Sequence, residues 1–281
     1  MMRLRPPALI LAALGLGCLH AMPASAAEKP LWELGAGVSA LSFPDYRGSD
    51  RSDTYAMPFP YVVYRGEFLK ADRNGIRGTF FNNDRIDLNV SVGASLPVKS
   101  SDNAARQGMP DLKPTVEIGP SLDLTMWRTD DHRYKLDLRL PVRTAITVDS
   151  SMQDIGWVFS PRLNLDVRDP LGLPGWNLGL LAGPMFGSAR NHQYFYAVAP
   201  QYATADRPAY EARGGYAGSQ FLMAVSKRYD RYWLGAFARW DTLKGAVFAD
   251  SPLVKRDYYF AAGVGVAWVF GQSSKLVETD E

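Results

Sequence analysis

Residues 133–148 read RYKLDLRLPVRTAITV, and apolar and polar side chains alternate along this stretch. The even positions from Tyr134 to Val142 are apolar, whereas the odd positions carry basic residues, one aspartate and Pro141. A strict period of two predicts a β-strand with one apolar and one polar face. Most later segments repeat this length and alternation between short turns or polar loops. Such segments are typical of membrane-crossing strands, so the sequence predicts an all-β fold, a transmembrane antiparallel up-and-down β-barrel.

The first 26 residues have the features of a secretory signal peptide. Arg3 and Arg5 form a charged start, residues 8–19 form a short apolar run, and Ala24-Ser25-Ala26 fits a cleavage site. Cys18, the only cysteine, lies inside the apolar run, so the mature chain is expected to contain none. Without the two arginines, the 31 basic residues fall to 29 and equal the 29 acidic residues. This balance gives no support to nucleic-acid binding, which usually shows as a basic excess.

The alternation predicts twelve strands after the signal peptide. They cover residues 31–43, 55–65, 67–72, 75–82, 85–97, 114–127, 132–148, 155–168, 176–188, 217–229, 232–245 and 256–270. If residues 67–82 formed a single strand the number would be eleven, but single-chain bacterial barrels have even strand numbers. Short turns then face the periplasm and the longer polar loops face outward. The barrel is expected to occupy residues 27–270, with a polar periplasmic tail at residues 271–281.

Four prolines fall inside predicted strands, although proline cannot donate to a strand on both sides. They are Pro120, Pro141, Pro161 and Pro184. In an up-and-down arrangement all four lie at similar distances from the outer strand ends. We therefore expect one level of the wall, across four adjacent strands, where the sheet is bulged or bent.

Five motifs resemble those of the MltA-interacting protein/OmpV family. They are PDYRGSD at residues 44–50, RNGIRG at 73–78, RQGMPDL at 106–112, EIGPS at 117–121 and DSPLV at 250–254. The resemblance covers nearly all of the mature chain and implies a barrel in the Gram-negative outer membrane, in contact with its lipid and lipopolysaccharide. For the family's namesake it implies a scaffold that joins a lytic murein transglycosylase to a bifunctional murein synthase. Other members are discussed as porin-like, adhesive or stress-responsive, and the family pattern offers no catalytic residues.

The last predicted strand resembles the terminal signal that the barrel-assembly machinery reads. The residues that carry this resemblance are Tyr258, Phe260, Trp268 and Phe270. In most such barrels the final phenylalanine ends the chain, whereas here Gly271–Glu281 follows it. A polar tail of this composition is expected to be disordered in the periplasm, and partner binding is the alternative.

The sequence offers little for catalysis, metal binding or cofactor binding. The mature chain has two histidines, His132 beside a turn and His192 in the longest loop. Ser188 and Glu211 share the loop of His192, but ester hydrolysis requires a serine, a base and an orienting group held in fixed geometry. Two isolated histidines are also a weak metal site. We therefore expect a protein that is not an enzyme and carries no cofactor.

Charged residues of both signs are expected to face the lumen. They are Glu117, Asp123, Arg133, Lys135, Asp137, Arg139, Arg143, Arg162, Asp166, Arg168, Arg239 and Asp241. These charges either pair across strands and fill a narrow barrel, or line a small aqueous path and set its selectivity. The near balance of signs favours pairing.

The loop Ser188–Tyr216 is the strongest candidate for a functional outer loop. Its contact candidates are Tyr194, Tyr196, Tyr202, Arg207 and Tyr210. Exposed aromatic residues beside arginine are typical of a contact surface. Alternatively, the loop folds over the barrel mouth and packs there.

The leading functional hypothesis is therefore a structural or scaffold protein for envelope and murein assembly. A scaffold would have to act from the periplasmic side, where the predicted barrel offers only turns and chain ends. A narrow channel for small solutes is the first alternative, and a surface adhesin is the second.

Overall fold

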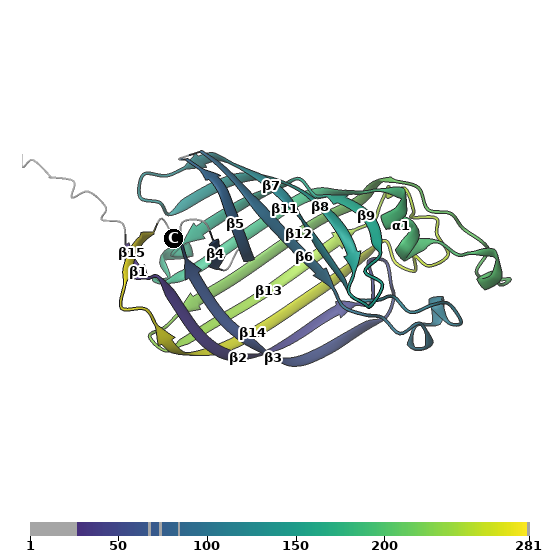
Figure 1. Cartoon of the computed structure of the whole chain (residues 1–281), viewed down its shortest axis with the longest axis horizontal. Helices are drawn as coiled ribbons and strands as arrows, with labels where there is room; N and C mark the ends of the chain where they lie inside the picture. The colour runs from purple at the N-terminus through teal and green to yellow at the C-terminus, as the bar shows by residue number, and fades with distance from the viewer. Residues whose placement is uncertain (1–26, 67–68, 73–74, 84, 280–281) are drawn as a thin grey trace, which may run out of the picture.

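The computed structural model describes residues 27–66, 69–72, 75–83 and 85–279. The predicted signal peptide, residues 1–26, lies outside the described residues, as do residues 73 and 74 of the RNGIRG motif. The described chain forms an antiparallel β-barrel with its longer loops at one end and both chain ends at the other (Figure 1). The predicted fold class is confirmed.

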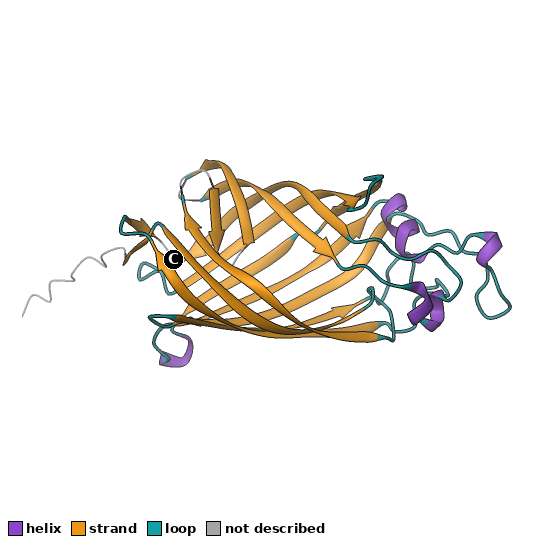
Figure 2. Ribbon diagram, turned by 60° about the horizontal axis from the view of Figure 1, so that its bottom comes forward, coloured by secondary structure: helices purple, strands orange, loops and turns teal. Residues whose placement is uncertain are grey.

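The barrel contains long strands and short helical turns. The strands are β1 (Ala27–Pro30), β2 (Trp32–Pro44), β3 (Ser52–Arg65), β4 (Leu69–Asp72), β5 (Gly75–Asn82), β6 (Ile86–Ser95), β7 (Thr115–Arg128), β8 (Tyr134–Thr147), β9 (Asp154–Phe159), β10 (Arg162–Arg168), β11 (Trp176–Gly187), β12 (Gly215–Arg228), β13 (Tyr232–Thr242), β14 (Tyr258–Gln272) and β15 (Leu276–Thr279). The helices are η1 (Ser100–Asp102), η2 (Ala104–Arg106), η3 (Pro170–Gly172), α1 (Ala189–Tyr196) and η4 (Pro200–Tyr202). Figure 2 shows most of the helical turns gathered at the loop end. In the described part of the chain, no helix has the length and apolar character needed to cross a membrane.

The strands follow one another around the barrel in sequence order, and β14 pairs with β2. The predicted strand at residues 155–168 is divided into β9 and β10, which both pair with β8 and β11. Among the described residues, the sheet of the barrel therefore has thirteen strands. If β9 and β10 are counted as one interrupted strand, the number is the predicted twelve.

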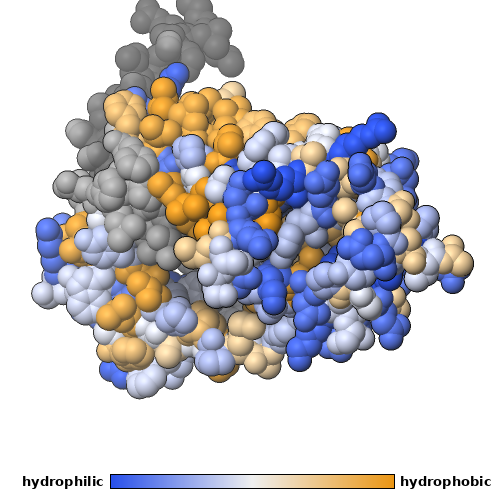
Figure 3. Space-filling view, turned by 45° about the vertical axis from the view of Figure 1, so that its right-hand side comes forward, coloured by the Kyte–Doolittle hydropathy of each residue, from blue (hydrophilic) through white to orange (hydrophobic). Residues whose placement is uncertain are grey.

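Large apolar side chains cover the outside of the wall. On β14, for example, Phe260 and Trp268 are 66% and 52% exposed, whereas Ala261 and Ala267 between them are buried in the lumen. Exposed apolar side chains are stable in contact with lipid hydrocarbon, so this band faces the membrane. The polar or small side chains between them point into the lumen. Figure 3 shows a largely hydrophilic loop end and hydrophobic side chains on the wall behind it.

The four strand prolines lie at one level on adjacent strands, as predicted. Pro141 is opposite Ser121, the residue after Pro120, and its carbonyl oxygen accepts the N–H of Ser160 beside Pro161. The backbone of β11 also approaches Pro161 closely at Gly183, the residue before Pro184. A Cβ on Gly183 would lie 2.1 Å from the carbonyl oxygen of Pro161. Pairing is interrupted along this line, which is why β9 and β10 are separate. We call this level the proline seam.

The tail differs from the expected disorder. β14 continues to Gln272, and β15 pairs with β1 in a two-stranded sheet. The connection is continuous, because the N–H of Leu31 donates to the carbonyl oxygen of Lys275 (2.9 Å). β2 and β14 are already neighbours, so their extensions meet without closing a further loop. We call the β1–β15 pair the periplasmic ribbon.

Candidate functional site: the capped lumen

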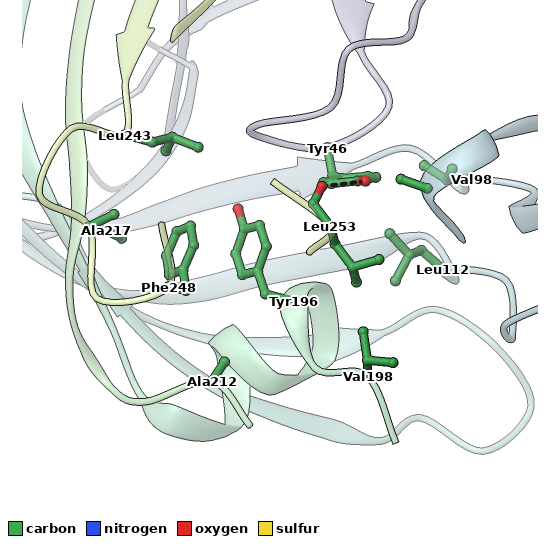
Figure 4. Packing of buried hydrophobic residues seen from close by; sticks show 12 residues of the cluster. Tyr46, Val98, Leu112, Tyr196, Val198, Ala212, Ala217, Leu243, Phe248 and Leu253 are labelled. Carbon is green, nitrogen blue, oxygen red and sulfur yellow. Dashed lines mark hydrogen bonds between the residues drawn. The ribbon is translucent and has the colours of Figure 1, made fainter. Parts of the chain in front are cut away.

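Four outer loops meet in a hydrophobic core at the barrel mouth, which we call the loop cap. Its buried residues are Tyr46, Val98, Ala105, Leu112, Tyr196, Val198, Ala212, Ala217, Leu243, Ala246, Phe248 and Leu253. Leu243, Phe248 and Leu253 have no exposed surface. The rings of Tyr196 and Phe248 stack with centroids 3.7 Å apart (Figure 4). These loops therefore pack as a small folded unit instead of extending into solvent.

Polar contacts tie the loops of the cap to one another. The hydroxyl of Tyr46 donates to the carbonyl oxygen of Leu253 (2.8 Å), and that of Tyr196 donates to the carbonyl oxygen of Arg47 (3.0 Å). The Ser251 hydroxyl donates to the carbonyl oxygen of Tyr196 (2.7 Å). Because each bond joins loops far apart in sequence, loosening one loop removes partners from the others.

The predicted contact residues of the longest loop lie within or against this cap. Tyr196 is buried, and the Tyr194 hydroxyl accepts the N–H of Lys113 (2.7 Å). Arg207 donates to the carbonyl oxygens of Tyr202 and Ala105. Tyr210 donates to Asp250. Their partners belong to this chain, so the loop adopts the second arrangement considered above, in which it packs over the mouth.

His192 on α1 is buried in the cap. Its Nδ1 lies 2.6 Å from the carbonyl oxygen of Arg213, while its buried Nε2 has no hydrogen-bond partner among the described residues. The ring meets Phe248 edge-on at 4.6 Å. Burial is the main cause that lowers the pKa of His192. The neutral imidazole therefore suits the folded cap, and this histidine has a packing role there.

Below the cap, a charge cluster closes the upper lumen. Asp241 has no exposed surface and contacts both Arg47 (3.1 Å) and Arg239 (2.6 Å). The hydroxyl of Tyr259 donates to the same carboxylate. Asp241 and Arg239 were predicted to face the lumen. Arg47 comes from an outer loop, and the sequence analysis did not place it in the lumen. Its place in the PDYRGSD motif was the available signal.

A second cluster spans the middle of the lumen. Arg139 lies 3.7 Å from Asp123, 3.5 Å from Asp137 and 3.7 Å from Asp166. Lys135 also pairs with Asp137 (3.2 Å). These contacts bring five of the predicted lumen residues together across β7, β8 and β10.

Close to the proline seam, Arg143 joins several strands at once. It pairs with Glu117 (2.9 Å) and donates to the hydroxyls of Ser91 (3.1 Å) and Ser160 (3.3 Å). These partners lie on β6 and β7 and at the β9–β10 interruption. Several of the predicted lumen charges therefore pair across strands, but they do not fill the lumen, which keeps the cavity described below.

A third cluster, at the periplasmic end, was missed. Glu33 is buried between Arg65 (2.9 Å) and Arg228 (2.7 Å). The alternation in the sequence could have placed Glu33 in the lumen, because residues 33, 35, 37 and 39 alternate with apolar residues on β2. Its partners lie 32 and 195 positions away in sequence, so the pairing itself required the fold.

Three predicted lumen residues stand apart from these clusters. Arg133 is exposed in the turn before β8, because the alternation continues past the point where the wall ends. Arg168 lines the cavity described next. Arg162 lines it too, and no carboxylate of the described residues lies within 4.0 Å of its guanidinium.

The lumen contains a cavity of about 1330 Å³ below the middle cluster. One side is polar and carries Arg139, Arg162 and Asp166. The facing side is apolar and aromatic, with Leu41, Met57, Phe59, Trp233 and Phe237. Glycines make room for these rings, because a Cβ on Gly37 would lie 2.6 Å from Phe59 and one on Gly263 would lie 2.5 Å from Phe237.

The predicted assembly residues share one face. Tyr258, Phe260, Trp268 and Phe270 are all exposed on the lipid side of β14. Trp268 and Phe270 are ring neighbours at 5.8 Å. They are placed where an aromatic girdle is expected.

Comparison with known proteins gives related sequences and solved structures that match at low identity. Outer membrane protein OmpV of Vibrio cholerae is 25% identical over 74% of this chain and 76% of its own length. Outer membrane protein Omp26La of Vibrio anguillarum is 24% identical over 84% and 86%. Among solved structures, an outer-membrane channel of Pseudomonas putida F1 covers 88% of this chain and 98% of its own at 12% identity (TM-score 0.42). Outer membrane phospholipase A of Escherichia coli covers 88% and 98% at 9% identity (TM-score 0.34).

The relatives are outer-membrane proteins, and this protein is likewise located in the outer membrane, as predicted. Residues 36–270 match the family described as MltA-interacting protein MipA. That match covers most of the chain and the whole barrel wall from β2 to β14. The chain therefore belongs to the MltA-interacting protein MipA family.

Proposed function

We propose that this protein is a non-enzymatic scaffold of the outer membrane that holds a murein-acting enzyme at its periplasmic end. The observation that carries the proposal is the loop cap. Fully buried side chains from four loops fill the outer mouth, and the ion-pair clusters occupy the lumen beneath it. A barrel closed in this way is poorly suited to free passage of solutes.

The family name supports the choice of partner. It describes its namesake as a protein that interacts with MltA. We extend that partnership to this chain, with a lytic murein transglycosylase as the enzyme held. The enzymatic chemistry then belongs to the partner, and the barrel supplies an anchorage in the outer membrane.

The periplasmic ribbon supplies a surface on the correct side. Among the described residues β15 pairs only with β1, so its other backbone edge is free. The outer edge of β1 is partly occupied, because Pro30 has no N–H and its carbonyl oxygen accepts a hydrogen bond from Arg65 (2.8 Å). An exposed edge can accept an extended segment of another protein as an additional strand. The chain ends on the periplasmic side are therefore paired as an ordered ribbon that offers a strand edge.

Affinity capture tests the scaffold. The purified barrel in detergent is immobilised and offered a lytic transglycosylase, with and without residues 273–281. We expect the full chain to retain the enzyme and the shortened chain to release it. Arg190→Gln, at an exposed outer position, is the matched control and should retain it. Equal capture by the full and shortened chains would contradict the ribbon's role, and no capture by the full chain would contradict the scaffold.

A second candidate is a narrow channel, because the lumen cavity is large enough for small solutes. It requires that the loop cap open. Ionic current through the purified protein in a planar bilayer distinguishes the two candidates, since a scaffold has no need to conduct.

A further inference from the structure

The barrel wall is incompletely paired between β3 and β6. β4 pairs with β3 only at Tyr64 and Arg65, and β5 pairs with β6 only between Asp87 and Asn89. Toward the outside, no described strand pairs with β3 over residues 52–62 on the side away from β2, or with β6 over residues 90–95 on the side away from β7. Figure 1 shows how short β4 and β5 are beside their neighbours. We call this interruption the lateral break.

The sequence of β3 prevents the break from being closed by pairing with β6. The N–H of Arg65 donates to the carbonyl oxygen of Leu31 (2.8 Å), so odd-numbered residues of β3 direct their N–H groups at β2. Even-numbered residues then direct theirs into the break. Pro58 and Pro60 are two of them, and proline has no N–H to offer. This edge cannot form a complete ladder with any other strand.

The strand that borders the break, β3, also lines the lumen cavity. Met57 and Val63, on the inner face of β3, line the cavity. Phe59 and Tyr61, on the inner face of the same strand, line it as well and lie 6.3 Å and 5.8 Å from the ring of Trp233. The apolar side of the cavity is therefore formed in part by the strand that borders the break.

Across the cavity, Arg162 offers a positive charge without a carboxylate partner in the described chain. Its Nε is buried and has no hydrogen-bond partner. Arg139 lies directly opposite it in the register of β8 and β10. The largest electrostatic influences on it are the guanidinium groups of Arg143, Arg139 and Arg239 and the carboxylate of Asp123. Asp123 is already close to Arg139. A guanidinium in such a place suits an anion, and its planar donors match the two oxygens of a carboxylate or a phosphate.

We propose that the lumen cavity binds a long-chain carboxylate, with its head at Arg162 and its apolar chain along Phe59, Trp233 and Phe237. The molecule enters sideways from the bilayer through the lateral break. A hydrocarbon chain gains from contact with the aromatic side of the cavity, and the head gains a charged hydrogen bond. The loop cap covers the outer mouth, whereas the break interrupts the pairing of the wall that faces the hydrocarbon in which such a molecule dissolves. This inference is independent of the scaffold proposal.

Binding is tested with the full mature chain in phosphatidylcholine nanodiscs and a dansyl-labelled undecanoate as the fluorescent probe. We expect saturable binding that Arg162→Gln weakens about tenfold or more, because one charged hydrogen bond is lost. Arg190→Gln, an exposed outer arginine, is the matched control. Ala224→Trp, which fills the cavity from β12 without changing charge, should also abolish binding. Heat-dependent migration in gels verifies that each variant is folded.

If Arg162→Gln binds the probe as tightly as the wild type does, the assignment of the head to Arg162 is wrong. The same holds if Arg190→Gln loses as much affinity for the probe as Arg162→Gln. Wild-type binding by folded Ala224→Trp would overturn the cavity as the site. The second variant keeps the proposal testable if the first fails to fold.

The route is tested separately. The mature chain lacks cysteine, so Ala56→Cys and Val92→Cys on the two exposed edges can be treated with bismaleimides of increasing length until one joins them across the break. With the probe already dissolved in the bilayer, we expect cross-linking to remove fast entry, while the unlinked double variant behaves as wild type. An entry rate unchanged by cross-linking would show that the carboxylate arrives from the periplasmic side, and the lateral route would be wrong.

Discussion

The rings of Tyr196 and Phe248 stack face to face, with centroids 3.7 Å apart and planes inclined by 11°. Tyr196 ends α1 in one outer loop and Phe248 lies in another, 52 positions along the chain. The edge-on contact of His192 with Phe248 adds a third ring. This pair joins two loops at the centre of the cap, so the closure of the barrel mouth depends on it.

Phe248→Ala is expected to loosen the cap while the barrel persists. Removing a fully buried phenylalanine costs about 3–5 kcal/mol, and the loss falls on the loops that pack around it. We expect rapid proteolytic cleavage within residues 188–214 under conditions in which wild type is uncut. Leu171→Ala, at a 99% exposed periplasmic position, is the matched control and should leave cleavage unchanged. Resistance equal to wild type in Phe248→Ala would show that the stack does not hold the loops.

The cap is expected to weaken in acid through His192. Burial lowers the pKa of His192 in the folded state, so the unfolded loop binds the proton more readily. The stability that its neutral form provides is complete above the ordinary histidine pKa of about 6.5 and is lost as the pH falls through the lower folded pKa. Proteolysis of the outer loops should therefore accelerate from about pH 7 to pH 5. His192→Gln should remove most of this pH dependence, and an unaltered profile in that variant would exclude His192 as its source.

Asp241→Asn is expected to destabilise the upper lumen strongly. The change leaves Arg47 and Arg239 facing a neutral side chain in a site without solvent, and breaking such a buried pair costs about 3–5 kcal/mol. The temperature at which the barrel loses its compact gel migration should fall. Asp154→Asn breaks the exposed pair with Arg190 and should cost only about 0–1 kcal/mol. If the two variants unfold at the same temperature, the buried ion pairs of Asp241 do not stabilise the barrel more than the exposed pair of Asp154 does.

Gly119, beside the proline seam, is expected not to tolerate a side chain. A Cβ on Gly119 would lie 2.0 Å from the carbonyl oxygen of Val142, so Gly119→Ala must shift β7 against β8. We expect a reduced yield of folded barrel in refolding from urea. Gly179→Ala is the matched strand control, because its nearest neighbour would lie at 3.7 Å, an ordinary contact. Normal refolding of Gly119→Ala would mean that the two strands are less closely packed than the structure shows.

Sequence periodicity predicts the wall well, for a physical reason. Each side chain of a strand such as β8 faces either lipid or lumen, so the alternation in residues 133–148 gives both the strand and its faces. The same alternation extends beyond the strand end, which is why Arg133 was assigned to the lumen although it lies in a turn. The seam was also predictable, because proline marks a missing donor in any sheet.

Contacts between segments far apart in the chain were harder to predict from the sequence. The loop cap is built from loops without a period, so its core, including Tyr196 and Phe248, emerges only when the loops converge. The pairing of Glu33 with Arg228 depends on closure of the barrel. Disorder was expected for the tail from its polar composition, yet its register beside β1 supplies backbone partners that composition does not reveal.

Single-channel recording in planar bilayers tests the central claim most directly, namely that the outer mouth is closed by its own loops. The account predicts a flat current for the purified wild-type protein, with discrete openings appearing in Phe248→Ala. Sustained ion steps from wild type, at a frequency that Phe248→Ala leaves unchanged, would contradict a closed mouth and favour the channel.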